Sequence, residues 1–326
     1  MKKLTKIALA VTLCSTLTSA MDLKSLAGLE MPPLALDRVG VSASLGAWYI
    51  NWDQTSNASD SFGSNAIDVT YDIKDSIAPT VDFKLNYNGM IGNVSYTNSE
   101  STSPKSNGED SGINSLSLGL LVLDMIPYVN LDLRYVKANF KGSIFAKDKA
   151  TGQISDGAFE SDLKIFEAVI YPMNRYLGVG YRKYEYEVPQ DLYVVNNNTG
   201  NVIIKGLADI SYKGDFIEVV LDNKKLIREV KEYSGLAYSM TAGLGKLDAS
   251  SDGFEQYLTK SDAVFYDLSL GYAYQHDAGD RLHYGMEIGY RYNAIDTTAK
   301  KDGDYSMITE FTTVFHGPYA SMNISY

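Results

Sequence analysis

The sequence predicts an all-β fold, a transmembrane antiparallel up-and-down β-barrel of about 12 strands with short periplasmic turns and long extracellular loops. Three observations predict it. Segments of roughly ten residues alternate strictly between large apolar and polar side chains, which is the period of a β-strand. Short and long connections alternate between these segments. No stretch approaches the roughly 20 consecutive apolar residues that a transmembrane helix needs.

The first 20 residues have the features of a secretory signal peptide. A basic start (residues 1–6) precedes an apolar run (residues 7–13), and small residues predict cleavage after Ala20. Cys14, the one cysteine of the chain, lies inside this segment. A lipoprotein anchor at this cysteine is the alternative, but Leu13 is bulkier than the residue that such processing prefers. The mature chain is therefore expected to hold no disulfide and no thiolate metal site.

Residues 21–40 are expected to form a periplasmic or lumenal segment, and residues 41–326 the barrel. The clearest strand covers residues 80–87, where every odd position is large and apolar and every even one is polar. A helix would mix these classes on each face, whereas a strand separates them. We place the strands at residues 41–52, 78–87, 90–98, 113–123, 128–139, 162–171, 176–187, 209–221, 234–246, 263–275, 282–293 and 313–326.

The connections between these strands alternate in length. The short ones cover residues 88–89, 124–127, 172–175 and 276–281, with one of medium length at residues 222–233. The long polar ones cover residues 53–77, 99–111, 140–161, 188–208, 247–262 and 294–312. In a transmembrane barrel the short turns face the periplasm and the long loops face outward.

The last predicted strand ends in an aromatic residue, Tyr326. Together with the signal peptide, the alternating strands and the loop rhythm, it makes the chain after residue 41 resemble bacterial outer-membrane β-barrel proteins of porin-like type. The resemblance implies the outer membrane of a Gram-negative bacterium, with the lipid bilayer and lipopolysaccharide as partners. It also implies insertion by the barrel-insertion machinery, which reads a terminal strand such as the one ending at Tyr326. No motif indicates a particular subfamily.

The alternative fold is a soluble all-β sandwich or propeller. It is less favoured because tyrosines gather at or near predicted strand ends, where their rings suit a membrane interface. Among them are Tyr87, Tyr171, Tyr290 and Tyr292. In hydrocarbon every backbone polar group must be paired, and a sheet without helices achieves this only when it closes.

The formal net charge is −11, and losing three lysines with the signal peptide lowers it to −14. Nucleic acid is therefore not an expected partner, because phosphate binding needs clustered Lys and Arg. The acidic side chains indicate hydrated outer loops. No cofactor is expected, and the oligomeric state stays open.

Side chains on the inward positions of the predicted strands are candidates for lining a pore, and glycine and serine between them would leave room for a narrow path. We expect a narrow, weakly selective channel for small solutes, because both charge signs occur. The alternative is a plugged structural or adhesive barrel that acts through acidic extracellular loops. The predicted lumen residues are Asp82, Lys84, Asp132, Arg134, Arg182, Glu218, Asp267, Glu287 and Arg291.

An enzyme is not expected. The chain has three histidines, and two of them, His276 and His283, fall at the predicted periplasmic end. His316 is predicted to face lipid near the outer leaflet, but Pro318 occupies the place where a barrel phospholipase has its serine. A second motif, residues 302–304, could hold a divalent cation, although a solvated loop tip is favoured.

Overall fold

The structure, a computed structural model, describes residues 40–59, 66–87, 89–101, 112–126, 129–148, 154–172, 176–188, 193–195, 202–205, 210–227, 232–251, 260–279, 282–299 and 308–326. Every described residue belongs to the compact unit of residues 37–326. The predicted signal peptide, most of the segment before the barrel and the candidate cation motif at residues 302–304 lie outside the described residues.

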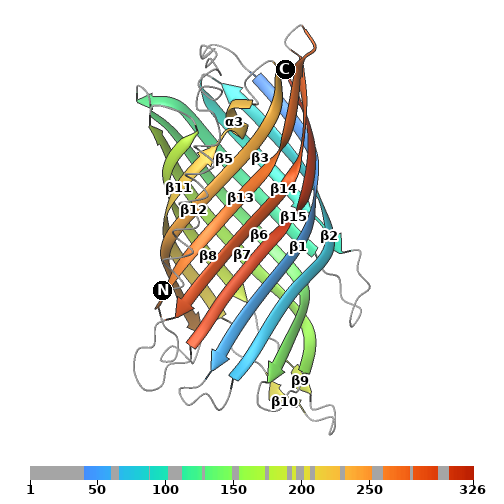
Figure 1. The fold of residues 1–326 in the computed structure, drawn as a ribbon, viewed down its shortest axis with the longest axis vertical. Coiled ribbons are helices and arrows are strands. Elements are labelled where there is room, and N and C mark those ends of the chain that lie inside the picture. Colours follow the sequence, from blue (N-terminus) through green and yellow to red (C-terminus); the bar gives the residue numbers. More distant parts are fainter. Residues whose placement is uncertain are drawn as a thin grey trace. The chain divides into compact units, whose positions relative to one another are not determined.

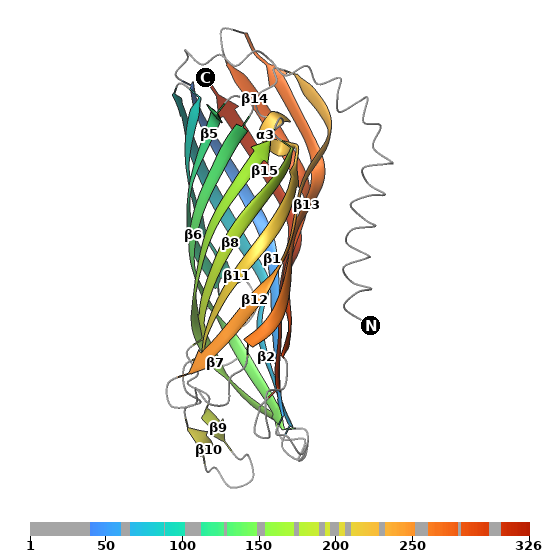
Figure 2. The same cartoon turned by 90° about the vertical axis from the view of Figure 1, so that its left-hand side faces the viewer.

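A closed antiparallel barrel of 12 strands is the core of the fold (Figures 1 and 2). Its ring order is β1-β15-β14-β13-β12-β11-β8-β7-β6-β5-β3-β2, and β2 pairs with β1 to close it. The strands are β1 (Gly40–Ser59), β2 (Ala66–Tyr87), β3 (Met90–Asn98), β5 (Gly112–Ile126), β6 (Val129–Asp148), β7 (Ile154–Pro172), β8 (Leu177–Val188), β11 (Ile210–Asp222), β12 (Tyr233–Ser251), β13 (Lys260–Asp277), β14 (His283–Ala299) and β15 (Ile308–Ser325).

Smaller elements sit in three of the connections. The two-residue strand β4 (Glu100–Ser101) pairs with β2, and β9 (Tyr193–Val195) pairs with β10 (Val202–Lys205) in a separate sheet. The four-residue helix α3 (Lys224–Ile227) connects β11 to β12. Within the described residues, no helix is long and apolar enough to cross a membrane.

The two ends of the barrel sequence meet at the same rim. The backbone N–H of Val41 donates to the carbonyl of Tyr326 at 2.9 Å, and the N–H of Tyr326 donates back at 2.8 Å. This is the rim where the short connections and α3 lie, so it corresponds to the predicted periplasmic end.

The predicted fold class and all twelve predicted strands are confirmed, and the bounds of β3 match the prediction residue for residue. The predicted lengths are wrong at the outer end. β1 continues to Ser59, and β2 already begins at Ala66. Likewise, β6 continues to Asp148, and β7 already begins at Ile154. The predicted loops 53–77 and 140–161 are therefore mainly strand. Outside the bilayer an outward side chain need not be apolar, so the alternation ends while backbone pairing continues.

This extension also moves acidic residues that were expected in loops. Asp68, Asp72 and Asp75 lie in β2, and Glu100 lies in β4. Beyond the outer ends of β3 and β5, β2 pairs directly with β6, from Asp72 opposite Ser143 to Ile67 opposite Asp148. The outer rim therefore lacks β3 and β5, and a ring of fewer strands is narrower.

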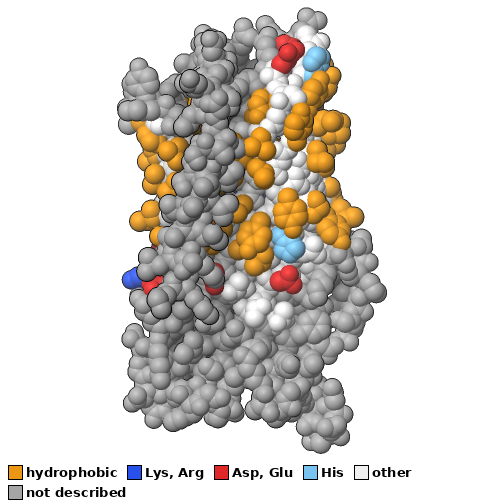
Figure 3. All heavy atoms as spheres, viewed as in Figure 1, with side chains coloured by type: hydrophobic (Ala, Val, Ile, Leu, Met, Phe, Trp, Pro, Cys, Tyr) orange, Lys and Arg blue, Asp and Glu red, His pale blue; other side chains and the backbone are white. Residues whose placement is uncertain are grey.

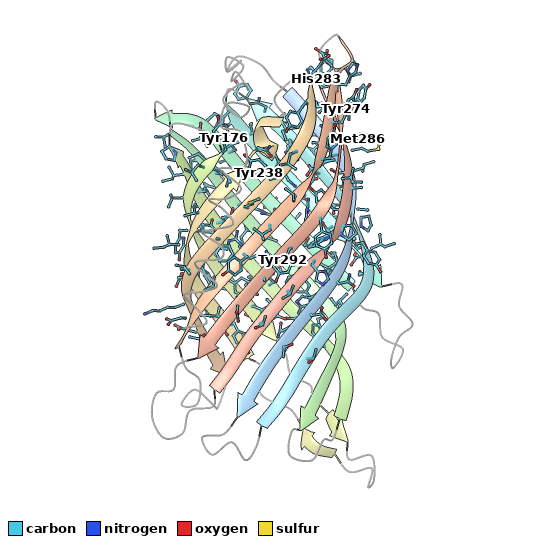
Figure 4. The ribbon with its side chains drawn as sticks, viewed as in Figure 1. Tyr176, Tyr238, Tyr274, His283, Met286 and Tyr292 are labelled. Atoms are coloured by element: carbon cyan, nitrogen blue, oxygen red, sulfur yellow. The ribbon has the colours of Figure 1, made fainter. Side chains whose placement is uncertain are left out.

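Large apolar side chains on the outward positions form a belt around the barrel. Leu45, Ile217, Ile288 and Met322 are each more than 60% exposed, and Figure 3 shows such side chains in a broad band between charged ones. Met286 points away from the wall in the same way (Figure 4). An apolar surface of this extent is not stable against water, so hydrocarbon must solvate it.

One tyrosine predicted to lie at the membrane interface, Tyr171, lies inside the barrel instead. Tyr171 is 1% exposed and packs with Val169 and Val220 inside the barrel, whereas Tyr87, Tyr290 and Tyr292 are exposed on the outer surface. Tyr171 is two residues from Val169 on β7, so both side chains point to the inside of the barrel. Its place near a predicted strand end did not reveal this direction.

Candidate functional site in the barrel lumen

Apolar rings fill the outer half of the lumen. Trp52 on β1 is fully buried, and its ring centroid lies 5.6 Å from that of Phe140, 5.1 Å from that of Phe159 and 5.6 Å from that of Phe315. The indole N–H of Trp52 donates to Thr313 Oγ1 at 2.7 Å, so the polar edge of the ring is also satisfied. We call Trp52, Phe140, Phe159 and Phe315 the aromatic cluster.

A hydrogen bond crosses the lumen beside this cluster. The hydroxyl of Tyr186 on β8 donates to Gln54 Oε1 on β1 at 2.8 Å, and both side chains are buried. In the ring order β8 lies six steps from β1 in either direction, so the two strands are on opposite walls. The bond therefore bridges the lumen from one wall to the other at this level.

Glycines on the inward positions accommodate rings rather than water. A Cβ on Gly243 would overlap the ring of Phe265, and one on Gly245 would lie 2.7 Å from the ring of Phe216. The two rings meet edge to face with centroids 5.2 Å apart. The expectation that small inward residues leave a narrow path is therefore wrong at these positions, because neighbouring rings take up the space.

A charged layer lies next to these rings. Arg182 Nη2 is 2.5 Å from Glu167 Oε2, and Arg182 Nε is 3.0 Å from Glu218 Oε2. The guanidinium carbon also lies 4.0 Å from the centre of the Phe265 ring. The side chain of Glu218 is completely buried, and a Cβ on Gly180 would lie 2.7 Å from its Oε1. Glycine at this position thus lets the carboxylate lie flat against the wall.

The turn that contains α3 folds back into the periplasmic half of the lumen. Lys224 Nζ lies 2.6 Å from Glu287 Oε1, and it donates to Ser269 Oγ at 2.6 Å and to Tyr319 Oη at 2.7 Å. Ile227 packs on the same side against small residues of β12 and β13. Burial lowers the pKa of Lys224, and the Glu287 carboxylate acts in the opposite direction.

Asn223 and Asp222 hold this turn in place. Asn223 Nδ2 donates to the carbonyl of Leu236 at 2.8 Å, and Asn223 Oδ1 accepts from the N–H of Tyr238 at 2.7 Å. Asp222 Oδ1 accepts from the N–H of Lys224 at 2.7 Å, as a residue at the start of a helix commonly does. From the sequence alone, residues 222–233 are predicted only as a periplasmic connection of medium length.

The remaining periplasmic half is polar and hydrated. Arg134 and Arg291 are exposed although they occupy inward positions, so water reaches them inside the barrel. The Arg291 guanidinium lies 4.5 Å from the centre of the Tyr319 ring. A small cavity next to α3 is lined by Ser44, Lys224, Gln275, Glu287, Ser321 and Asn323, among others. We call this region the periplasmic vestibule.

The nine predicted lumen residues do not form one ring. The structure brings Arg182 and Glu218 together, and it pairs Glu287 with Lys224. Asp82 accepts from Ser44 at 2.9 Å on the neighbouring strand, and Arg134 donates to Ser117 at 3.4 Å. The nine are spread over several levels of the wall: Asp82 and Lys84 on β2, Asp132 and Arg134 on β6, Arg182 on β8, Glu218 on β11, Asp267 on β13, and Glu287 and Arg291 on β14.

Sequence reasoning missed two charged partners and the aromatic cluster. Glu167 shares the inward parity of Leu163 and Ile165 on β7 and could have been found by it. Lys224 lies outside any strand, so no periodicity points to it. Phe140 and Phe159 lie where the predicted strands had already ended.

His316 lies on an outward position of β15. Its Nδ1 is 2.8 Å from the hydroxyl of Tyr290, and its Nε2 is 4.0 Å from Asp53 Oδ2. The residue two positions on is Pro318, which carries no nucleophile.

A closed antiparallel barrel with an apolar outer belt and a polar interior on one side defines a transmembrane β-barrel of the outer-membrane class. Barrels of this class span the outer membrane, so the protein is placed there.

No protein-family model and no curated protein matches the sequence. Among solved structures, the chain is similar to the outer membrane protease OmpT from Escherichia coli, with 9% identity, 91% of this chain and 100% of that chain covered, and a TM-score of 0.34. It is also similar to the β domain of the Bordetella autotransporter BrkA, with 12% identity, 86% and 99% covered, and a TM-score of 0.30.

A third similar structure is a FadL homologue from Pseudomonas aeruginosa, with 11% identity, 92% and 93% covered, and a TM-score of 0.30. Because these TM-scores are low, the class assignment rests on the chain's own barrel closure and apolar belt.

Proposed function

We propose that this protein is a closed outer-membrane barrel, sealed against ions and hydrophilic solutes, that acts through the surfaces it presents outside the bilayer and carries no catalytic activity. The observation that carries the proposal is the hydrogen bond from Tyr186 to Gln54 across the lumen, beside the aromatic cluster. Well-packed rings in contact from wall to wall exclude water, and an ion entering them would lose its hydration.

The second candidate function is the narrow, weakly selective channel expected from the sequence. The periplasmic vestibule favours it, because Arg134 and Arg291 are reached by water from one side. In this proposal the aromatic cluster is a gate, and a displacement of its rings would connect the vestibule to the outside.

Planar-bilayer conductance of the purified full-length barrel separates the two candidates. We expect a flat trace for the natural protein at all voltages. The double variant Trp52→Ala/Phe140→Ala should show openings, because it removes two of the four rings of the aromatic cluster.

The matched control is Phe83→Ala/Tyr284→Ala, which removes two rings that face lipid. It should stay flat. A steady current through the natural protein would defeat the closed barrel and favour the channel. A flat trace from the cluster variant would show that the seal lies elsewhere.

We also propose that the barrel-insertion machinery recognises the terminal strand. β15 closes the barrel against β1, and Tyr326 is 66% exposed at the rim next to Val41. A terminal aromatic ring that is not buried in the fold is available to another protein.

A further inference from the structure

Arg291 on β14 is a lumen arginine that aromatic rings hold in place. Its guanidinium carbon lies 4.5 Å from the centre of the Tyr319 ring and 5.8 Å from the centre of the Trp48 ring. Within the described part of the chain, Arg291 forms no ion pair and no hydrogen bond. The residue is exposed, so the N–H donors of its guanidinium face the water of the periplasmic vestibule.

The strand register explains why no carboxylate pairs with Arg291. Directly opposite it stand Gly317 on β15 and Ser269 on β13. The next inward residues along β14 are Gly289 and Asn293. None of these four neighbours carries a charge, so the positive charge of the guanidinium is not neutralised by its surroundings on the wall.

Two carboxylates lie further away along the register, and both are engaged elsewhere. Glu287, four residues from Arg291 on β14, lies 2.6 Å from Lys224 Nζ. Asp267 is diagonal to Arg291 on β13, and its charge acts on Arg182. Among the described residues, neither carboxylate forms an ion pair with Arg291.

Two other arginines of the lumen have acidic neighbours. Arg182 pairs with two carboxylates, one of which belongs to Glu167. Arg134 stands opposite Glu167 and has Asp132 two residues along its own strand. The contrast singles out Arg291 as the lumen arginine whose wall neighbours are all uncharged.

The ring next to Arg291 is fixed to the wall. Glycines on β14 and β13 make room for it, because a Cβ on Gly289 would lie 2.8 Å from the Tyr319 hydroxyl and one on Gly271 would lie 2.9 Å from it. The hydroxyl accepts from Lys224 Nζ at 2.7 Å. A guanidinium stacked on a ring that is held in this way is already oriented, so little freedom is lost when a ligand binds.

We propose that Arg291 binds the carboxylate of a small organic acid that enters the vestibule from the periplasm, with Trp48 and Tyr319 flanking the ion pair. A guanidinium offers two parallel N–H donors, which match the two oxygens of a carboxylate. Protein walls of low dielectric strengthen this attraction relative to bulk water. The proposal does not depend on whether the lumen conducts, because the vestibule lies on the periplasmic side of the aromatic cluster.

Trp48 supplies the readout, because Trp48 and Trp52 are the two tryptophans of the chain. The full-length barrel with Trp52→Phe is titrated with acetate in detergent micelles, with chloride keeping the ionic strength constant. Acetate should change the emission of Trp48 with a saturable midpoint. Arg291→Gln in the same background should bind roughly tenfold more weakly, from the usual contribution of a hydrogen bond to a charged group. Arg291→Lys should fall between the two, because it keeps the charge and loses the paired donors.

The matched control is Arg134→Gln, which removes the same charge from the opposite wall of the vestibule and should leave the midpoint nearly unchanged. An equal loss in this control would overturn the proposal, because the overall charge of the vestibule would then attract the acid. An equal response to acetamide, or tighter binding of phosphate, would also overturn it. Retained heat-modifiable migration on a gel shows that each variant is folded.

A second measurement does not depend on fluorescence. Acetate should slow the modification of Arg291 by phenylglyoxal, mapped by mass spectrometry, and should leave the modification of Arg134 unchanged. If acetate altered neither the emission of Trp48 nor the modification of Arg291, the carboxylate site would be ruled out.

Discussion

The two halves of the lumen are lined by opposite chemistry. The outer half packs rings around Trp52 and holds a hydrogen bond between opposite walls, from Tyr186 to Gln54. The periplasmic half uses charges, with Lys224 on Glu287 and exposed arginines beside it. The layer of Arg182 lies where the two chemistries meet, because its guanidinium both pairs with carboxylates and covers the Phe265 ring.

The difference follows from access to water. A group that water can reach needs no partner inside the protein, so Arg134 and Arg291 can remain exposed in the vestibule. A group sealed behind the aromatic cluster must be apolar or fully paired, because an unpaired charge there is costly. The comparison therefore predicts that the same substitution has different effects in the two halves.

The largest expected effect is at the boundary layer. Arg182→Met leaves Glu167 and Glu218 buried without their cation, and breaking a buried pair in this way costs about 3–5 kcal/mol. Urea unfolding in detergent or lipid vesicles measures the loss. Arg134→Met, the same change in the hydrated vestibule, should cost less than about 1 kcal/mol.

A compensating variant sharpens this prediction. Adding Glu218→Gln to Arg182→Met should restore part of the stability, because one of the two stranded charges is removed. Equal stability of the Arg182→Met and Arg134→Met proteins would contradict the distinction between a sealed layer and a hydrated one.

The sequence predicted the wall well and the contents of the lumen poorly. The alternation in residues 80–87 and 282–293 is imposed locally, by lipid on one side of each strand, so it is readable without the fold. Parity also placed Arg182 and Glu218 on inward positions of two strands, β8 and β11, which are neighbours in the ring. Which inward residues meet depends on which strands lie opposite, and the twelve-strand ring order decides that.

Two features had no local signal. The outer extensions of β6 and β7 carry Phe140 and Phe159 into the aromatic cluster, although the apolar alternation stops near Lys137 and Lys164. The turn at α3 enters the lumen because Lys224 finds Glu287, Ser269 and Tyr319 there, three side chains that are distant in sequence.

A smaller effect is expected where a ring lies over a glycine. Gly243→Ala places a methyl group inside the Phe265 ring, and overpacking of this kind costs about 1–3 kcal/mol. The control is Gly92→Ala on β3, where an added Cβ meets nothing within 4 Å, so its stability should stay the same or rise slightly. Similar unfolding midpoints for the two alanine variants would mean that the outer half is loosely packed.

The smallest effect is a pH dependence that comes from the vestibule side. Burial holds the pKa of Lys224 in the folded protein below 10.5, so the unfolded chain binds more protons between the folded pKa and 10.5. In that window the contribution of Lys224 to the unfolding free energy therefore rises with pH, and below the window it is constant. Unfolding of the natural protein and of Lys224→Met, compared at neutral and alkaline pH, isolates this contribution from the tyrosines. A stability difference that moved in the opposite direction with pH would mean that the ion pair with Glu287 outweighs burial, and that the periplasmic half is held by charge more firmly than its access to water implies.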